Sequence, residues 1–309
     1  MKPTVLAILC SDIHLSAKPP IARAGEPDWF KAMARPLREL RELGAKHEAP
    51  ILCAGDIFHK WNSPPELISF AIEHLPKMYA IPGQHDLPLH SLEDIRKSAY
   101  WTVVKAGVVK NLPMGTDGTL VNTPAGHGLI RAFAFPWGVD IHPLRVRREE
   151  VNIALIHRYV WSDSLNSYPG APAEQRLRTY RPTLRGYDIA AFGDNHKPFM
   201  GYCGECRVVN HGGLMRRNSD EIEHRPAVYL VMSDMSVFKH YLDCSKDVID
   251  EGPSIELLEA EEFKAEAFIK ELTEMDGASV DYPDAVKHYL KTRQVSKGAT
   301  QLILQSIEQ

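Results

Sequence analysis

The chain has 309 residues, of which 44% are hydrophobic and 25% charged, a composition typical of a soluble globular protein with one large or two ordinary domains. No apolar run approaches the roughly 20 residues needed to span a bilayer, and Asp12 and His14 interrupt the N-terminal apolar run, so we expect a cytoplasmic protein without a signal peptide or membrane association. The net charge of −4 by itself says nothing about a polyanionic partner, and five scattered cysteines argue against a disulfide framework.

Apolar runs typical of strands alternate with helical runs along most of the chain. The run at 4–10 precedes an amphipathic stretch at 28–47, and the run at 50–55 precedes 64–75, where two prolines favour a helix start. Further runs typical of strands follow at 77–82, 129–136, 151–157, 187–193, 207–213 and 227–232. This alternation predicts an α/β fold built around buried sheets.

The C-terminal part differs in charge and pattern. Residues 231–309 carry 8 Lys and Arg against 16 Asp and Glu, whereas residues 1–230 carry 28 against 24. We therefore predict a main domain at 1–245 and an acidic helical appendage at 246–309. The apolar spacing at 255–275 predicts an amphipathic helix, which either packs back on the main domain or docks a partner.

Cys203 and Cys206 form a single C-x2-C pair in the stretch "CGEC". Without a second pair this is a weak zinc signal, and its simpler interpretation is the tight turn of a hairpin.

Five of the predicted strands end in polar residues that bind metal ions in proteins. Because the carboxyl ends of strands in an α/β sheet line one crevice, these side chains are expected to lie together. Imidazole and carboxylate groups together suit Mn²⁺, Fe²⁺ or Zn²⁺, and two ions can clamp the oxygens of a phosphoester displacement. The residues are Asp12 and His14, Asp56 and His59, Gln84, His85 and Asp86, His157, and Asp194 and His196.

These residues stand in motifs that resemble a known family. "DIH", "GDIFH", "GQHD", "IHRYV" and "GDNH" follow the order of the calcineurin-like metallophosphoesterase motifs D-x-H, G-D-x-x, G-N-H-D, a lone H and G-H-x-H. His59 in "GDIFH" and the segment "NHGGLMRR" resemble the SbcD-type double-strand-break repair nucleases and the recombination endonuclease subunits of phages. The resemblance implies a four-layer β-sandwich flanked by helices, with the small C-terminal helical appendage added.

The resemblance also implies roles for the motif residues. Asp12, His14 and His196 would bind one ion, Asp56 would bridge, and Gln84, His157 and Asp194 would bind the other. His85 and His59 would be catalytic, with Asp86 orienting His85. Gln84 and Asp194 depart from the Asn and His of the family, and the added carboxylate favours two Mn²⁺ ions, or Mg²⁺, over Zn²⁺.

The surroundings of the motifs suggest the substrate. Arginines outside the ligand motifs favour nucleic acid, with Arg145, Arg147, Arg148, Arg216 and Arg217 as candidate contacts. Together with the arginines, the resemblance to the repair nucleases implies a DNA exo- and endonuclease that acts in recombination and repair, with DNA, an SMC-like coiled-coil ATPase subunit and a second copy of the chain as partners. A small-molecule phosphoesterase and a non-catalytic scaffold with an altered metal site remain alternatives.

Overall fold

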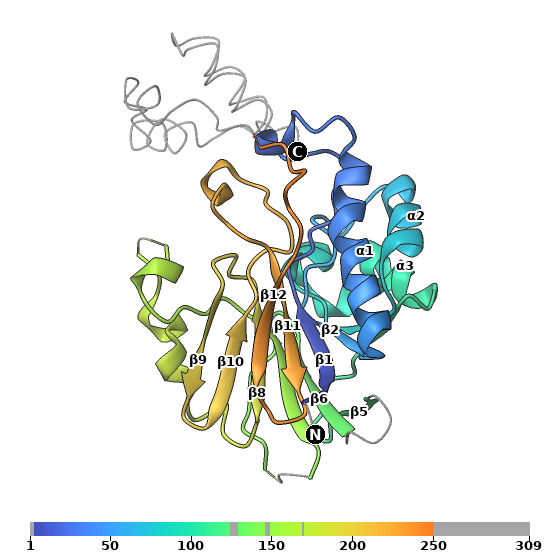
Figure 1. Ribbon diagram of the computed structural model, residues 1–309. Coiled ribbons are helices and arrows are strands. Elements are labelled where there is room, and N and C mark those ends of the chain that lie inside the picture. Colours follow the sequence, from blue (N-terminus) through green and yellow to red (C-terminus); the bar gives the residue numbers. More distant parts are fainter. Residues whose placement is uncertain (1–2, 124–128, 146–148, 169, 250–309) are drawn as a thin grey trace, which may run out of the picture. The chain divides into compact units, whose positions relative to one another are not determined.

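The computed structural model describes residues 3–123, 129–145, 149–168 and 170–249. Two six-stranded sheets form its centre, with strand orders β12-β11-β1-β2-β3-β4 and β5-β6-β7-β8-β10-β9 (Figure 1). The strands of the first sheet are β1 (Val5–Cys10), β2 (Ile51–Cys53), β3 (Met78–Ala80), β4 (Val109–Asn111), β11 (Ala227–Met232) and β12 (Val237–Tyr241). Those of the second are β5 (Thr119–Asn122), β6 (Leu129–Phe135), β7 (Val151–His157), β8 (Ile189–Gly193), β9 (Phe199–Cys203) and β10 (Cys206–Asn210).

Most neighbouring strands are parallel. β1 to β4 run parallel in the first sheet, and β6, β7, β8 and β10 run parallel in the second. The carboxyl ends of these strands therefore share one edge of each sheet. The expected hairpin is confirmed, since β9 and β10 are antiparallel with Cys203 opposite Cys206.

Helices cover the outer face of the first sheet (Figure 1). The predicted helix at 28–47 is α1 (Trp29–His47), and the Asp28 side chain caps it by accepting a 3.0 Å hydrogen bond from the Lys31 amide. α2 (Pro65–His74) begins at a proline as expected, whereas the short α3 (Ala99–Lys105) was not predicted. Short 3₁₀ helices span Ile21–Arg23, Gln84–Asp86, Pro88–His90, Leu92–Lys97, Ser164–Asn166, Ala173–Gln175, Leu177–Tyr180 and Ser219–Glu221.

Three apolar cores separate the layers. Between the sheets, Leu9 and Val231 of the first pack with Leu155 and Ala191 of the second. Outside the first sheet, Ile8 packs with Met33 of α1 and Phe70 of α2. Outside the second sheet, Phe192 packs with Leu177 and Tyr180 of a 3₁₀ helix. Since each fully buried Leu, Ile or Phe contributes about 1.5–3 kcal/mol, these cores hold the layers together. The predicted fold class is confirmed: two mixed sheets lie between flanking layers.

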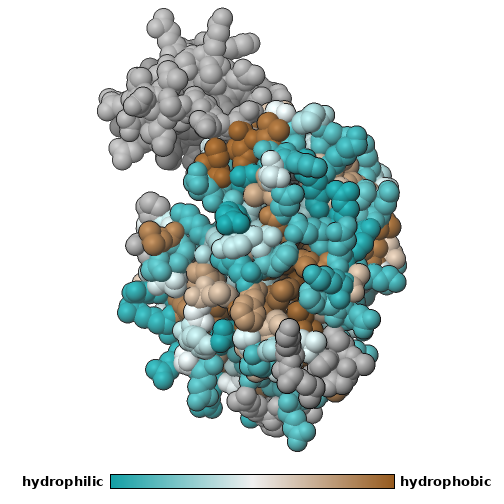
Figure 2. Space-filling model, viewed as in Figure 1, coloured by the Kyte–Doolittle hydropathy of each residue, from teal (hydrophilic) through white to brown (hydrophobic). Residues whose placement is uncertain are grey.

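Residue contacts divide the chain into Met1–Gly252 and Pro253–Gln309. The second unit lies outside the described residues, and so do the helices predicted from residue 255. Within the described ranges, no helix has both the length and the apolar character needed to cross a membrane. The face seen in Figure 2 is largely hydrophilic, with hydrophobic residues in separate patches.

Candidate active site

The polar residues that follow the strands come together in three dimensions. Asp12 and Asp56 follow β1 and β2 of the first sheet, whereas His157 is the last residue of β7, and Asp194 and His196 follow β8 of the second. Ligand atoms form three groups, in each of which all atoms lie within 4.8 Å of one another: those of Asp12, His14 and His196, those of Asp12, Asp56 and His157, and those of His14, His59 and His85. The two sheets thus contribute jointly to one site.

The backbone turns sharply at several of these residues. Asp12, His14, Asp56 and Asp194 have φ angles of 52°, 49°, 54° and 88°, in the left-handed region that residues other than glycine rarely adopt. Each such residue costs about 1–3 kcal/mol of strain, which persists where the surroundings over-determine it, often at functional sites. Four of the eight non-glycine residues with positive φ in the described ranges are thus predicted metal ligands.

The first donor group consists of Asp12 Oδ1, His14 Nε2, Asp56 Oδ2 and His196 Nε2. His14 Nε2 lies 3.0 Å from His196 Nε2 and 3.6 Å from Asp56 Oδ2. Asp12 Oδ1 lies 3.9 Å from His14 Nε2 and 4.0 Å from His196 Nε2. Burial, and then the neighbouring His196, hold the pKa of His14 well below its usual value, so its ring is neutral.

The second donor group consists of Asp12, Asp56 and His157. Gln84 and Asp194, which the sequence predicts as further ligands here, hydrogen-bond to each other. His157 Nδ1 donates to the Ala54 carbonyl at 2.6 Å, so Nε2 is the ring nitrogen that faces Asp56 Oδ2, at 3.3 Å. Burial opposes a charge on this ring, but Asp56 outweighs it and raises the pKa of His157 to about 10, with smaller contributions from Asp12 and Asp194.

Both groups fit divalent cations. Gln84 Oε1 is buried and accepts no hydrogen bond from the described residues, and the buried atoms Asp56 Oδ2 and His157 Nε2 have, among these residues, only each other as hydrogen-bond partners. A buried polar atom without a partner costs roughly 1–3 kcal/mol, and a cation among these atoms would remove that penalty. The raised pKa of His157 fits the same interpretation. Without a metal ion, a proton on His157 Nε2 lies where a cation bound to His157 and Asp56 would lie.

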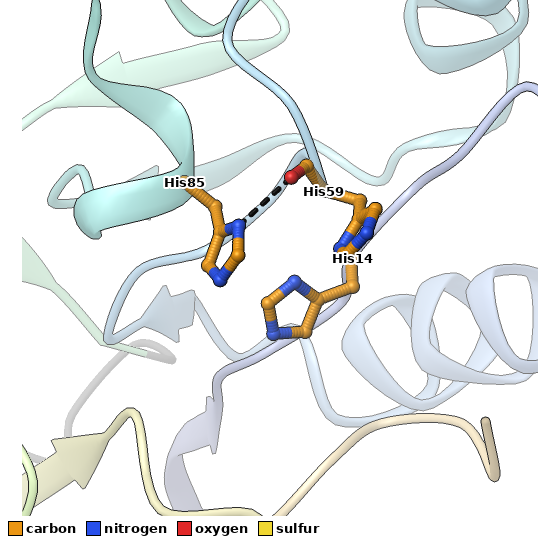
Figure 3. A group of neighbouring side chains, drawn as sticks. All are labelled: His14, His59 and His85. Atoms are coloured by element: carbon orange, nitrogen blue, oxygen red, sulfur yellow. Dashed lines mark hydrogen bonds between the residues drawn. The ribbon is translucent and has the colours of Figure 1, made fainter. Parts of the chain in front are cut away.

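His85 and His59 lie beside His14 of the first donor group (Figure 3). The His85 amide donates to Asp56 Oδ1 at 3.0 Å, and its ring Nδ1 donates to the His59 carbonyl at 2.8 Å. The two rings stack with centroids 5.2 Å apart, and the His85 centroid lies 4.9 Å from that of His14. Burial, and then Arg217, lower the pKa of His59 to about 4, so this imidazole is neutral.

Asp86 is buried beneath this pair. Its carboxylate accepts hydrogen bonds from the amides of Ile57, Phe58 and Gly83, at 3.2, 2.9 and 3.0 Å. Asp86 thus ties the loop after β2 to the loop after β3, and the His85 ring is held by the His59 carbonyl. The orientation of His85 by Asp86 stays a prediction that would act through these loops.

Two residues near the site were not assigned these positions from the sequence. Glu221 accepts from the amides of Arg217 and Asn218, at 2.6 and 3.1 Å, and lies 3.8 Å from His196 Nδ1. Burial opposes ionisation of Glu221, but the contact with His196 and these amides bring its pKa to about 2. Arg217 is buried and donates from Nη1 to the His14 carbonyl at 2.6 Å. Glu221 therefore contacts the predicted ligand His196, and Arg217 contacts the backbone of the predicted ligand His14.

The arginines predicted to contact DNA lie in different surroundings. Arg216 donates to Asp247, Ile222 and Cys244, and Arg217 to His14, so both are engaged within the protein. Arg145 is exposed, and Arg147 and Arg148 lie outside the described residues. DNA contact by these side chains stays a prediction.

Comparison with known proteins supplies a family. The family described as calcineurin-like phosphoesterase matches residues 7–198. No curated protein matches the chain.

Among solved structures, the chain is similar to a sulfate thiohydrolase from Thermus thermophilus, with 13% identity and a TM-score of 0.46 over 84% of this chain and 60% of that one. It is also similar to a 5'-nucleotidase precursor from the same organism, with 13% identity and a TM-score of 0.45 over 84% and 58%. An archaeal phosphodiesterase is 10% identical, with a TM-score of 0.36 over 76% and 99%. The chain thus spans less than two thirds of the thiohydrolase and nucleotidase chains.

Proposed function

Because the chain belongs to the calcineurin-like phosphoesterase family, whose model matches residues 7–198, we propose that it is a two-metal DNA nuclease that works with an SMC-like ATPase in recombination and repair. The family makes it a phosphoester hydrolase with a metal site. The proposal adds the substrate, the metal and the partner.

The side chains that flank the donor groups carry the proposal for a phosphodiester. His59 and His85 flank the site, whereas the guanidinium of Arg217 is directed at the His14 carbonyl. Two divalent ions among three carboxylates would leave a net charge of about +1, which matches a singly charged phosphodiester better than a doubly charged monoester. DNA is proposed as this diester because the sequence around His59 resembles the repair nucleases.

The metal ligands, His85 and His59 have separate roles in the proposed reaction. Metal ions held by the two donor groups would lower the pKa of a water molecule and stabilise charge on the phosphate. His85 donates from Nδ1 to the His59 carbonyl, which fixes the ring and leaves Nε2 directed away from that contact. A protonated His85 can therefore give the Nε2 proton to the departing oxygen. His59 holds His85 in place through its carbonyl and by ring stacking.

A matched diester and monoester, together with two forms of DNA, test this assignment. The protein is incubated with Mn²⁺ and bis-p-nitrophenyl phosphate, p-nitrophenyl phosphate, linear duplex DNA or single-stranded DNA. We expect hydrolysis of the diester and of DNA, with the monoester at least about tenfold slower, a difference of about 1.4 kcal/mol. Preferred cleavage of the monoester would indicate a small-molecule phosphatase, and hydrolysis of none of the substrates would indicate a scaffold.

The metal preference is a prediction of its own. The second donor group is rich in oxygen, with Asp12 and Asp56 beside His157, and oxygen ligands favour Mn²⁺ or Mg²⁺ over Zn²⁺. We expect diester hydrolysis to be faster with Mn²⁺ or Mg²⁺ than with Zn²⁺ when metal occupancy, measured by elemental analysis, is equal. Equal or faster turnover with Zn²⁺ contradicts this expectation.

The acidic C-terminal region is the proposed docking segment for the ATPase. Residue contacts separate Pro253–Gln309 from the catalytic unit, and the apolar spacing at 255–275 is that of an amphipathic helix. We expect truncation at about residue 250 to leave diester hydrolysis unchanged and to abolish co-purification with the ATPase subunit. Loss of hydrolysis would place the region in the catalytic core, and retained binding would place the docking surface elsewhere. Sedimentation of both forms also tests the proposed homodimer.

A further inference from the structure

Gln84 and Asp194 form a hydrogen bond across the site. Gln84 Nε2 donates to Asp194 Oδ1 at 2.6 Å, joining the loop after β3 in the first sheet to the loop after β8 in the second. An ionised carboxylate offers only acceptors, so the amide group that faces it must be the NH₂. The carbonyl oxygen of Gln84 is therefore directed the other way.

The freed carbonyl oxygen has no partner of its own. Gln84 Oε1 is buried and accepts no hydrogen bond from the described residues. Its backbone neighbour Gly83 lies against the second donor group, because a Cβ added there would come 2.6 Å from His157 Nε2. The position of Gln84 and the absence of a donor for Oε1 both suit an oxygen ligand of a cation.

Asp194 is itself held in place. Its backbone has a φ of 88°, and its amide donates to Asp12 Oδ1 at 3.0 Å. Asp194, which accepts the hydrogen bond from Gln84, is thus bonded to Asp12 of the first donor group. Gln84 is the predicted ligand in the second donor group. The pair connects the two groups.

We propose that Asp194 is a positioning residue for Gln84, and that the affinity of the second metal ion depends on this pair acting as a unit. Asp194 Oδ1 holds the amide so that Oε1 faces the second donor group. The first donor group contains neither side chain and binds its ion without the pair. This inference deepens the proposed function and shares with it only the requirement for metal ions.

The lengths of the two side chains provide the test. Gln has one methylene more than Asn, and Glu one more than Asp, so Q84N/D194E keeps both the functional groups and their summed length. Mn²⁺ is titrated by calorimetry into the full-length, metal-free protein without substrate. We expect each single variant to bind the second ion at least about tenfold more weakly, the range seen when a ligand loses its orienting partner. The double variant is expected to recover to within about threefold of wild type, as coupled residues do.

A second substitution separates positioning from direct coordination. Asp194→Asn is isosteric and keeps an oxygen that can accept from Gln84, so positioning predicts a smaller loss for D194N than for D194E. The first ion's affinity and the thermal unfolding in EDTA report whether each variant is folded. The proposal is overturned if the single losses multiply in Q84N/D194E, or if D194N binds the second ion more weakly than D194E. Because no substrate is present, neither outcome depends on whether the protein cleaves DNA.

Discussion

Asp56→Asn is expected to abolish diester hydrolysis while leaving the protein folded. Asp56 Oδ2 belongs to both donor groups, at 3.6 Å from His14 Nε2 and 3.3 Å from His157 Nε2, and Oδ1 accepts from the His85 amide. Loss of this shared ligand should exceed the roughly 10–100-fold effect of losing a ligand's outer partner. An Asn amide in the same place would donate to the lone pairs of the two histidines, which satisfies them without a cation.

The measurements are kcat/KM on bis-p-nitrophenyl phosphate, bound metal by elemental analysis, and thermal unfolding in EDTA. Asp140→Asn is the matched control, since the Asp140 side chain is fully exposed and lies 3.7 Å from Arg158. We expect the control to keep activity and metal, and D56N to lose both with an unfolding temperature no lower than that of wild type. Near-normal turnover in D56N would remove Asp56 from the proposed site.

Gly83→Ala is expected to disrupt the site through a single added methyl group. Gly83 has a φ of −94° and a ψ of −176°, which alanine adopts freely, so the backbone itself is no obstacle. The added Cβ would lie 2.1 Å from Asp56 Oδ1 and 2.6 Å from His157 Nε2. The loop or both ligands must then move, and a displacement of about 1 Å at a reacting centre can lower the rate about 100-fold.

Gly201→Ala is the control for this substitution. A Cβ at Gly201 in β9 would meet only Leu177 Cδ2, at an ordinary contact distance of 3.8 Å. We expect G201A to retain wild-type kcat/KM and metal content, and G83A to lose about 100-fold in kcat/KM with weakened metal binding. If G83A stays within threefold of wild type, the close packing of Gly83 against Asp56 and His157 is not needed for activity.

Strand ends made much of the site predictable from the sequence. Asp12, Asp56 and His157 each follow or end a short apolar run, and parallel strands bring such residues to one edge. The helices at 28–47 and 64–75 were predictable for a similar reason, because their periodicity and starting residues are local signals. The short α3 and the edge strands β4, β5 and β12 carry weaker patterns and were missed.

The supporting contacts were not predictable, since the chain gives them no local signal. Glu221 approaches His196 from a three-residue 3₁₀ helix 25 positions further along, and the Ala54 carbonyl fixes His157 across 103 positions. Likewise, the sequence marks Gln84 and Asp194 as departures from the family, but only the folded chain shows that the two side chains are bonded to each other.

The joint origin of the donors has a consequence for folding. Asp12 and Asp56 come from the first sheet and His157 and His196 from the second, so neither donor group exists until both sheets have formed and packed. An ion would then bind the folded chain and not the unfolded one. Each ion would act as a cross-link between the sheets, adding about 2.7 kcal/mol when its free concentration is 100 times its dissociation constant. The supply of free metal would thus set the stability of the folded protein as well as its rate of turnover.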